Sequence, residues 1–178
     1  MISIQHIRTT DKDNYRFAEN LLTTAFPKEE RRELSLQRKY TDHNKQFNNN
    51  ILLVDEDPIG FISYWDFDDF LYVEHFAIDE TKRNGGYGKL VLNVLKEKLQ
   101  RPIVLEVELP KDEISKRRIS FYQRQGFQLW EKEYQQPPYR KGDNYLPMYL
   151  MIQGELNNSI DFDQVKDTLY KEVYLIEK

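Results

Sequence analysis

Three glycines near the middle of the chain stand where a backbone can bind phosphate. Gly85, Gly86 and Gly88 follow a short polar turn and precede a segment whose apolar residues recur every three or four positions. Glycine lets the main chain approach a ligand closely, and the first N–H groups of a helix have no intrahelical partners. The pattern predicts an anion site for a phosphate ligand. The alternative is a tight strand-to-helix turn that needs glycine only for its backbone angles.

The order of residues around these glycines argues against two common phosphate motifs. The chain has no Gly-x4-Gly-Lys-Ser/Thr, and its Gly-Gly-x-Gly order differs from the Gly-x-Gly-x-x-Gly of dinucleotide-binding folds. Instead, Arg83 to Gly88 has the form Arg/Gln-x-x-Gly-x-Gly. Downstream, the segment Ser120-Phe-Tyr-Gln-Arg-Gln-Gly-Phe127 lies at the end of a later predicted helix. Together the two segments resemble the signatures of the GNAT superfamily of N-acetyltransferases, and the resemblance spans residues 1–152.

This resemblance implies a fold and a co-substrate. The fold is α+β, with a mixed, strongly twisted central sheet of six to seven strands, helices on both faces, and two central parallel strands that splay apart. The co-substrate is acetyl-CoA, and no metal is implied. The loop would bind pyrophosphate through backbone N–H groups, and Ser115 stands where many relatives have a cofactor-contacting Asn. The implied cofactor-binding residues are Phe76, Ala77, Ile78, Arg83, Asn84, Gly85, Gly86, Tyr87, Gly88, Lys89 and Ser115.

Two residues are predicted to move protons. Tyr122 matches the family tyrosine that protonates the departing thiolate; the alternative is a half-buried packing tyrosine. An acceptor amine arrives mostly as ammonium, so a base must take its proton before nitrogen can attack a thioester. Glu74 is the candidate base, because it is an acid in an otherwise apolar strand and alternation places it on the face of Phe76 and Ile78. The alternative is a carboxylate paired with a basic residue. His75 would face the other side unless a bulge intervenes.

The acceptor pocket of the superfamily is built from the first two helices and the connection before the last strand. Here those segments supply Phe26, Glu29 and Arg31, then Tyr139 and Arg140. The arginines are candidates for a substrate carboxylate and Glu29 for an ammonium. We predict acetyl transfer to a primary amine of a small molecule by direct attack. The alternatives are a protein N-terminus or lysine as acceptor, and a non-catalytic acyl-CoA-binding module.

Composition limits the class of protein. The chain has 178 residues, a net charge of −4 and no cysteine, so it has no disulfide and no thiolate nucleophile. It lacks the ~20-residue apolar run of a membrane helix and the basic and apolar segments of a signal peptide. Its basic residues are scattered, which argues against a nucleic-acid surface. We therefore predict a cytoplasmic protein without membrane or nucleic-acid partners, either a monomer or a homodimer.

The elements that must position these residues can be read from hydrophobic periodicity. We expect one domain, residues 1–178, with 153–178 as a C-terminal helical appendage. The polar segment 44–50 is expected to be a turn, and the strand at 102–108 is expected to run parallel to the strand at 70–78. Strands are predicted at 2–8, 51–54, 59–67, 70–78, 102–108, 127–134 and 145–152, and helices at 11–25, 28–40, 90–99, 113–125 and 161–170.

Overall fold

The computed structural model describes residues 1–177, which form seven strands and five α-helices. The chain divides into two compact units, Met1–Arg101 and Pro102–Lys178. The first unit holds the glycine-rich loop and the predicted base, and the second holds the predicted acid. Each unit is described by itself.

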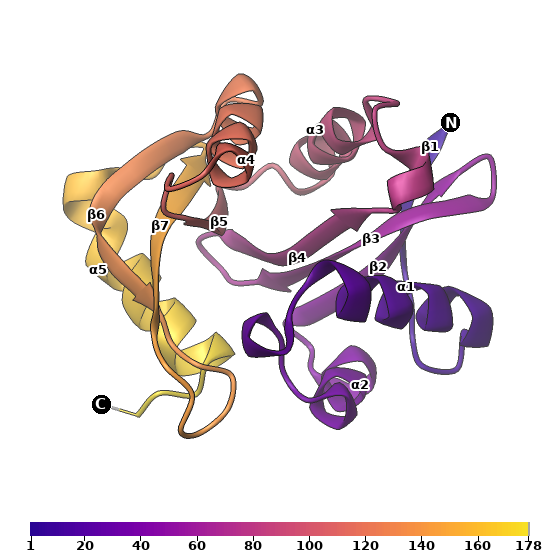
Figure 1. The fold of residues 1–178 in the computed structure, drawn as a ribbon, viewed down its shortest axis with the longest axis horizontal. Helices are drawn as coiled ribbons and strands as arrows, with labels where there is room; N and C mark the ends of the chain where they lie inside the picture. The colour runs from indigo at the N-terminus through magenta and orange to yellow at the C-terminus, as the bar shows by residue number, and fades with distance from the viewer. Residues whose placement is uncertain (178) are drawn as a thin grey trace. The chain divides into compact units, whose positions relative to one another are not determined.

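The first unit is built on four strands in the order β1-β2-β3-β4, and each neighbouring pair is antiparallel. Two of its helices, α1 and α2, lie against one face of these strands, and α3 lies on the other side (Figure 1). Short 3₁₀ helices cover Lys28–Glu30 and Glu80–Lys82. The other elements are β1 (Ile2–His6), α1 (Lys12–Ala25), α2 (Leu34–His43), β2 (Phe47–Val54), β3 (Asp57–Asp66), β4 (Leu71–Ile78) and α3 (Tyr87–Leu99).

The core of this unit forms where the apolar stripe of α1 meets the sheet. Leu22 of α1 and Ile51 of β2 are completely buried there, and Phe61 packs beside Ala77 across the β3–β4 pair. Burying such side chains stabilises the fold by about 1.5–3 kcal/mol each. This packing fixes β4 against β3 and so sets the position of the strand that leads into the glycine-rich loop.

Two predicted elements of the first unit differ in the structure. The polar segment before β2 is not all turn, because Phe47–Val54 is strand; the side chain of Asn49 donates to Thr41 Oγ1 at 3.1 Å and that of Asn50 to the Ile62 carbonyl at 3.3 Å. The predicted helix at 28–40 is interrupted at residues 31–33, where Arg31 and Glu33 have extended backbone angles. This break turns the Arg32 side chain into the interior, where it is 2% exposed.

The second unit is built on three strands in the order β5-β7-β6, with antiparallel neighbours. The helix α4 packs on β5 and β6, and α5 runs along β6, where Phe162 contacts Trp130 (Figure 1). Five residues of π-helix, Leu169–Val173, extend α5, so the C-terminal helical region begins earlier and ends later than predicted. The elements are β5 (Ile103–Glu108), α4 (Glu113–Arg124), β6 (Gln128–Gln136), β7 (Leu146–Gln153) and α5 (Asn158–Thr168).

Among residues 1–177, no helix combines the length and the apolar character that crossing a membrane requires.

Candidate active site

The glycine-rich loop ends in a helix N-terminus that is open to a ligand. Gly86 is the N-cap of α3 and has a left-handed φ of 71°, a region that L side chains rarely adopt. A Cβ added to Gly86 would meet no atom within 4 Å, and no side chain caps the helix. Because the first N–H groups of a helix have no partner within it, those of α3 are available to an anion. The loop fits a pyrophosphate.

The neighbours of Gly86 shape the loop in different ways. Asn84 also has a left-handed φ, of 67°. The ring of Tyr87 lies over Gly85, where an added Cβ would approach a ring carbon to 2.6 Å, so a larger residue at 85 would displace the ring. The guanidinium of Arg83 donates to the Ile78 carbonyl at 3.3 Å and contacts Glu80 at 3.4 Å. Arg83 thus ties the loop to the end of β4. Gly88 is half-buried and Lys89 is exposed at the start of α3.

The strand before the loop contains a bulge at Glu74. On β3, Ser63 pairs with His75 and the next residue, Tyr64, pairs with Val73, so the register shifts by one residue and Glu74 is the additional residue on β4. Strict alternation fails at this point. His75 and Glu74 consequently point to the same side, with His75 Nδ1 and Glu74 Oε2 3.9 Å apart. Glu74 therefore does not share the face of Phe76, which alternates with His75.

The Glu74 carboxylate is buried in a polar contact set. Its side chain is 0% exposed and forms an ion pair with Arg32. The indole N–H of Trp65 donates to its second oxygen at 3.2 Å. Both contacts supply donors to the carboxylate oxygens, as a buried carboxylate requires. The structure thus shows Glu74 in the arrangement that was the alternative to a base, a carboxylate paired with a basic residue.

His75 is a buried imidazole held by the main chain. Its Nε2 lies 2.8 Å from the Glu30 carbonyl, and its ring contacts the Phe26 ring at 4.7 Å. A carbonyl only accepts, so Nε2 carries the proton of the neutral ring. Burial lowers the pKa of His75, and the charge of Arg32 acts in the same direction while that of Glu74 opposes it. His75 is therefore neutral at pH 7.

The second unit holds Tyr122 near the end of α4. Its ring packs edge-on against Phe121 and Phe127, at 5.2 and 5.4 Å. Burial raises the pKa of Tyr122 to about 12, so the phenol keeps its proton at any ordinary assay pH. The half-buried, protonated phenol is compatible with the predicted proton donor and also with the alternative of a packing tyrosine, so the role of Tyr122 stays a prediction.

Ser115 lies at the other end of the same helix, and its hydroxyl is used locally. The N-cap of α4 is Asp112, whose carboxylate accepts from the Ser115 N–H at 2.7 Å, and the Asp112 main-chain N–H donates to the Ser115 hydroxyl oxygen at 3.2 Å, which makes a reciprocal capping box. Ser115 is 2% exposed. The structure supports a helix-capping role for this hydroxyl rather than the predicted cofactor contact.

The predicted acceptor residues belong to both units. In the first, Phe26 joins the edge of the core and its carbonyl accepts from Arg31 Nε at 3.3 Å, while Glu29 is exposed in the 3₁₀ helix. In the second, Tyr139 and Arg140 are half-buried after β6, and the Tyr139 ring contacts that of Tyr174 at 5.2 Å.

Two buried polar clusters were not predicted from the sequence. The first is the Arg32–Glu74 pair. Arg32 follows Arg31 in a charged segment, so the sequence suggests that it is exposed to solvent. A Glu buried in an apolar strand nevertheless requires a basic partner. In the second unit, Glu106 of β5 accepts hydrogen bonds from Tyr134, Gln136 and, at 2.8 Å, Tyr174. Burial and the Glu106 charge raise the pKa of Tyr134 well above its usual value. In both clusters the available signal is an acid inside an apolar strand.

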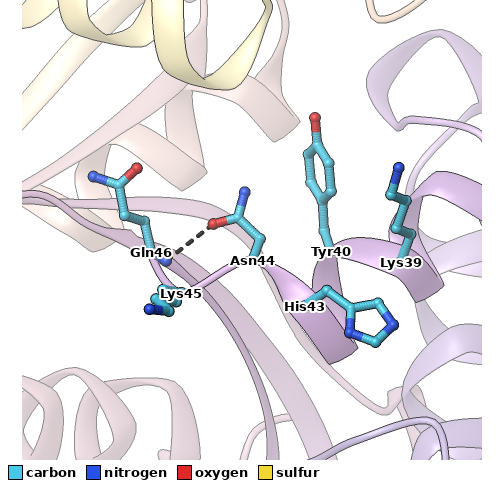
Figure 2. Close-up of a pocket in the computed structure, with 6 residues that line it drawn as sticks. All are labelled: Lys39, Tyr40, His43, Asn44, Lys45 and Gln46. Carbon is cyan, nitrogen blue, oxygen red and sulfur yellow. Dashed lines mark hydrogen bonds between the residues drawn. The ribbon is translucent and has the colours of Figure 1, made fainter.

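A surface hollow of 430 Å³ lies at the end of α2 and contains none of the predicted site residues (Figure 2). In it, the Asn44 amide oxygen accepts from the main-chain N–H of Gln46 at 2.9 Å. The hollow is lined by Lys39, Tyr40, His43, Asn44, Lys45 and Gln46. Within residues 1–177, no group of three or more His, Asp or Glu side chains is arranged to hold a metal ion.

Residues 15–127 match the model of the acetyltransferase (GNAT) family, and the chain belongs to that family. The match includes the loop at Gly86, the strand with Glu74 and the helix with Tyr122. The protein is thus an acetyltransferase of a family that uses acetyl-CoA.

Individual relatives agree with this assignment. A putative GNAT acetyltransferase from Bacteroides thetaiotaomicron has a solved structure that is 55% identical, with a TM-score of 0.96 over 98% of this chain and 99% of that one. The predicted α+β class with six to seven strands in a mixed sheet is confirmed by this match. The putative acetyltransferase YjbC of Bacillus subtilis is 36% identical over 76 residues, which is 41% of this chain and only 38% of that relative.

A more distant structure shares the fold alone. An aminoglycoside 6′-N-acetyltransferase complexed with coenzyme A is 12% identical, with a TM-score of 0.63 over 87% of this chain and 99% of that one.

Proposed function

We propose that this acetyltransferase transfers the acetyl group of acetyl-CoA to a primary amine of a small molecule. The observation that carries the cofactor part is the start of α3, where the left-handed Gly86 leaves open space beside uncapped N–H groups. A phosphate accepts hydrogen bonds from such groups and is stabilised by the positive end of the helix dipole. The small-molecule acceptor is carried over from the sequence prediction, and the aminoglycoside enzyme is an example of the same fold with such an acceptor.

The cofactor contacts of the proposal lie in the first unit. The loop from Arg83 to Gly88, with Lys89, binds the pyrophosphate mainly through backbone N–H groups. The main chain of Phe76, Ala77 and Ile78 pairs with the amides of the pantetheine arm, in the manner of an added strand. Phe76 and Ile78 are half-buried and alternate with the buried Ala77, as a ligand-facing strand end requires.

The chemistry is a direct transfer. When bound, acetyl-CoA supplies the acetyl group as a thioester. The ammonium first loses one proton to solvent water. The neutral nitrogen then forms the new C–N bond, the C–S bond breaks, the thiolate takes the phenolic proton of Tyr122, and the proton released by the new amide nitrogen returns to the phenolate. The absence of cysteine from the sequence removes the commonest acyl-carrying nucleophile. Ternary-complex kinetics are therefore expected, and an isolated acyl-enzyme would refute direct transfer.

For the acceptor, the proposal keeps the residues predicted from the sequence. Glu29 pairs with an ammonium group of the substrate, and Arg31 and Arg140 with any carboxylate. Phe26 and Tyr139 supply apolar surface. The proposal retains the cytoplasmic location, the monomeric or homodimeric state, and the lack of nucleic-acid and membrane partners that were predicted from the sequence.

The test is a screen of amines with acetyl-CoA that measures released thiol. The panel contains polyamines, amino acids and aminoglycosides, and it also contains peptides with a free N-terminus or an internal lysine. Turnover of a small amine with no turnover of peptides supports the proposal. Turnover of peptides alone indicates a protein acceptor. Tight CoA binding by calorimetry with no acceptor at all would indicate a non-catalytic acyl-CoA-binding module.

A further inference from the structure

A buried charge pair connects the segment before α2 to the middle of β4. Arg32 and Glu74 are 2% and 0% exposed at their side chains. Arg32 also donates to Gln37 Oε1 at 2.6 Å. Its guanidinium lies over the rings of Tyr40, Phe47 and Trp65, at 5.1, 5.2 and 5.8 Å from their centroids. A charge this enclosed holds its position, because leaving either partner alone in the interior is costly.

The acidic member of the pair, Glu74, lies where the pairing of β4 with β3 shifts by one residue. Glu74 is the extra residue of the bulge opposite Ser63 and Tyr64. Its side chain is fully buried, yet the residue as a whole is only half-buried, so its exposed area belongs to the main chain. The contacts of the Glu74 side chain with Arg32 and, at 3.2 Å, with the indole N–H of Trp65 therefore restrain the residue that presents this exposed main chain.

We propose that Arg32 is a positioning residue, which holds the Glu74 bulge and thereby the main-chain groups of β4 that bind the cofactor. The inference rests on the proposed binding of acetyl-CoA along Phe76 to Ile78. A bulge decides which N–H and carbonyl groups face outward along a strand, because a shift of one residue reverses their direction. A ligand that pairs with the strand requires one register. Glu74 has, on this inference, a structural role in place of that of a base.

The first experiment compares two arginine substitutions. Arg32→Met removes the buried charge and keeps a long side chain. Arg38→Met is the control, because Arg38 forms a surface ion pair with Glu19 at 2.5 Å and is 53% exposed. Loss of one or two main-chain hydrogen bonds to the ligand, at about 1 kcal/mol or more each, should raise the calorimetric Kd for CoA about 10- to 100-fold in Arg32→Met. The Kd should stay unchanged in Arg38→Met. Amide exchange of residues 73–78 should quicken only in Arg32→Met.

Two more variants keep the test decisive if Arg32→Met folds poorly. Trp65→Phe removes the indole N–H bond to Glu74 and reduces the buried ring beside Arg32, while the buried charge pair remains. We expect a smaller rise in Kd with the same local change in exchange. The double variant Arg32→Met with Glu74→Gln leaves no unpaired charge, so its thermal stability should recover while CoA binding stays weak. If both thermal stability and CoA affinity recover in the double variant, the Arg32–Glu74 pair only stabilises the fold, and the inference is overturned.

Glu74→Gln separates positioning from base catalysis. On the proposal, the Kd for CoA rises and the acidic limb of kcat/KM against pH remains. Loss of that limb with unchanged CoA affinity would assign Glu74 the role of base and overturn the inference. Wild-type protein that fails to bind CoA would refute the proposed function instead. In that case the exchange rates of residues 73–78 still show whether Arg32 holds the bulge.

Discussion

Gly86→Val is expected to abolish CoA binding, and Gly126→Val provides a matched control. Both glycines have left-handed φ angles, 71° and 88°, and at both an added Cβ would meet nothing within 4 Å. Steric strain in the free protein is thus of the same kind at each position. Only Gly86 starts the helix whose N–H groups are assigned to pyrophosphate.

The magnitude follows from the backbone angle. A non-glycine residue in the left-handed region costs roughly 1–2 kcal/mol, which lowers Tm by about 2–8 °C in a chain of this size. Both variants should show this loss. For CoA, the valine branches at Gly86 occupy the space beside the N–H groups. A hydrogen bond to a charged phosphate is worth about 1.5–3 kcal/mol, so losing two of them lowers the affinity at least about 100-fold. Gly126→Val should bind CoA as the wild type does.

The assay is calorimetric titration with CoA on variants whose folding has been checked by thermal unfolding. Normal CoA affinity in Gly86→Val would refute the pyrophosphate assignment. Equal loss of affinity in both variants would show that strain, rather than the blocked approach, is responsible.

Three further predictions concern single side chains. Tyr122→Phe should lower turnover about ten- to a hundredfold without changing CoA affinity. Because the pKa of Tyr122 is about 12, the phenol should cause a fall in rate only near that pH. An unchanged rate in Tyr122→Phe would show that Tyr122 is not the proton donor. Ser115→Ala should lower the free energy of unfolding by about 0.5–1.5 kcal/mol through the lost contact with Asp112, and CoA titration should show no change, whereas weaker binding would restore the cofactor contact. The pKa of His75 is lower in the native state than its usual value of 6.5. As the pH falls below 6.5, the unfolded chain therefore binds a proton at this residue that the native protein does not bind. Stability should therefore decline from pH 7 to pH 5, and His75→Gln should flatten that decline in urea unfolding; an identical pH dependence would contradict the assignment.

Local patterns in the sequence were enough to predict the loop and most of the elements. The glycines at 85, 86 and 88 indicate a backbone that needs left-handed angles and close approach, and Gly86 indeed has φ 71°. These signals are local because backbone sterics act within a few residues. The order of apolar periods along the chain indicates which segments become strands and which become helices, whereas the class of the fold was implied by the resemblance of the loop and the Tyr122 segment to the GNAT signatures.

Long-range contacts decided the features that local patterns missed. Whether Glu74 shares a face with Phe76 depends on a bulge, and alternation alone cannot show where a ladder gains a residue. The sequence around Asn49 and Asn50 is typical of a turn, but both residues lie in a strand. The tertiary fold places Thr41 and the Ile62 carbonyl within hydrogen-bond distance of their side chains. Their polar side chains are tolerated in the interior only because these partners exist.

The partners of buried charges were decided in the same way. The sequence shows that a Glu lies in an apolar strand, which predicts that something must compensate it. It does not show that the compensating charge is Arg32, 42 positions earlier, enclosed by three aromatic rings. Burial strengthens such a pair because little water remains to screen it, and burial is a property of the assembled tertiary structure.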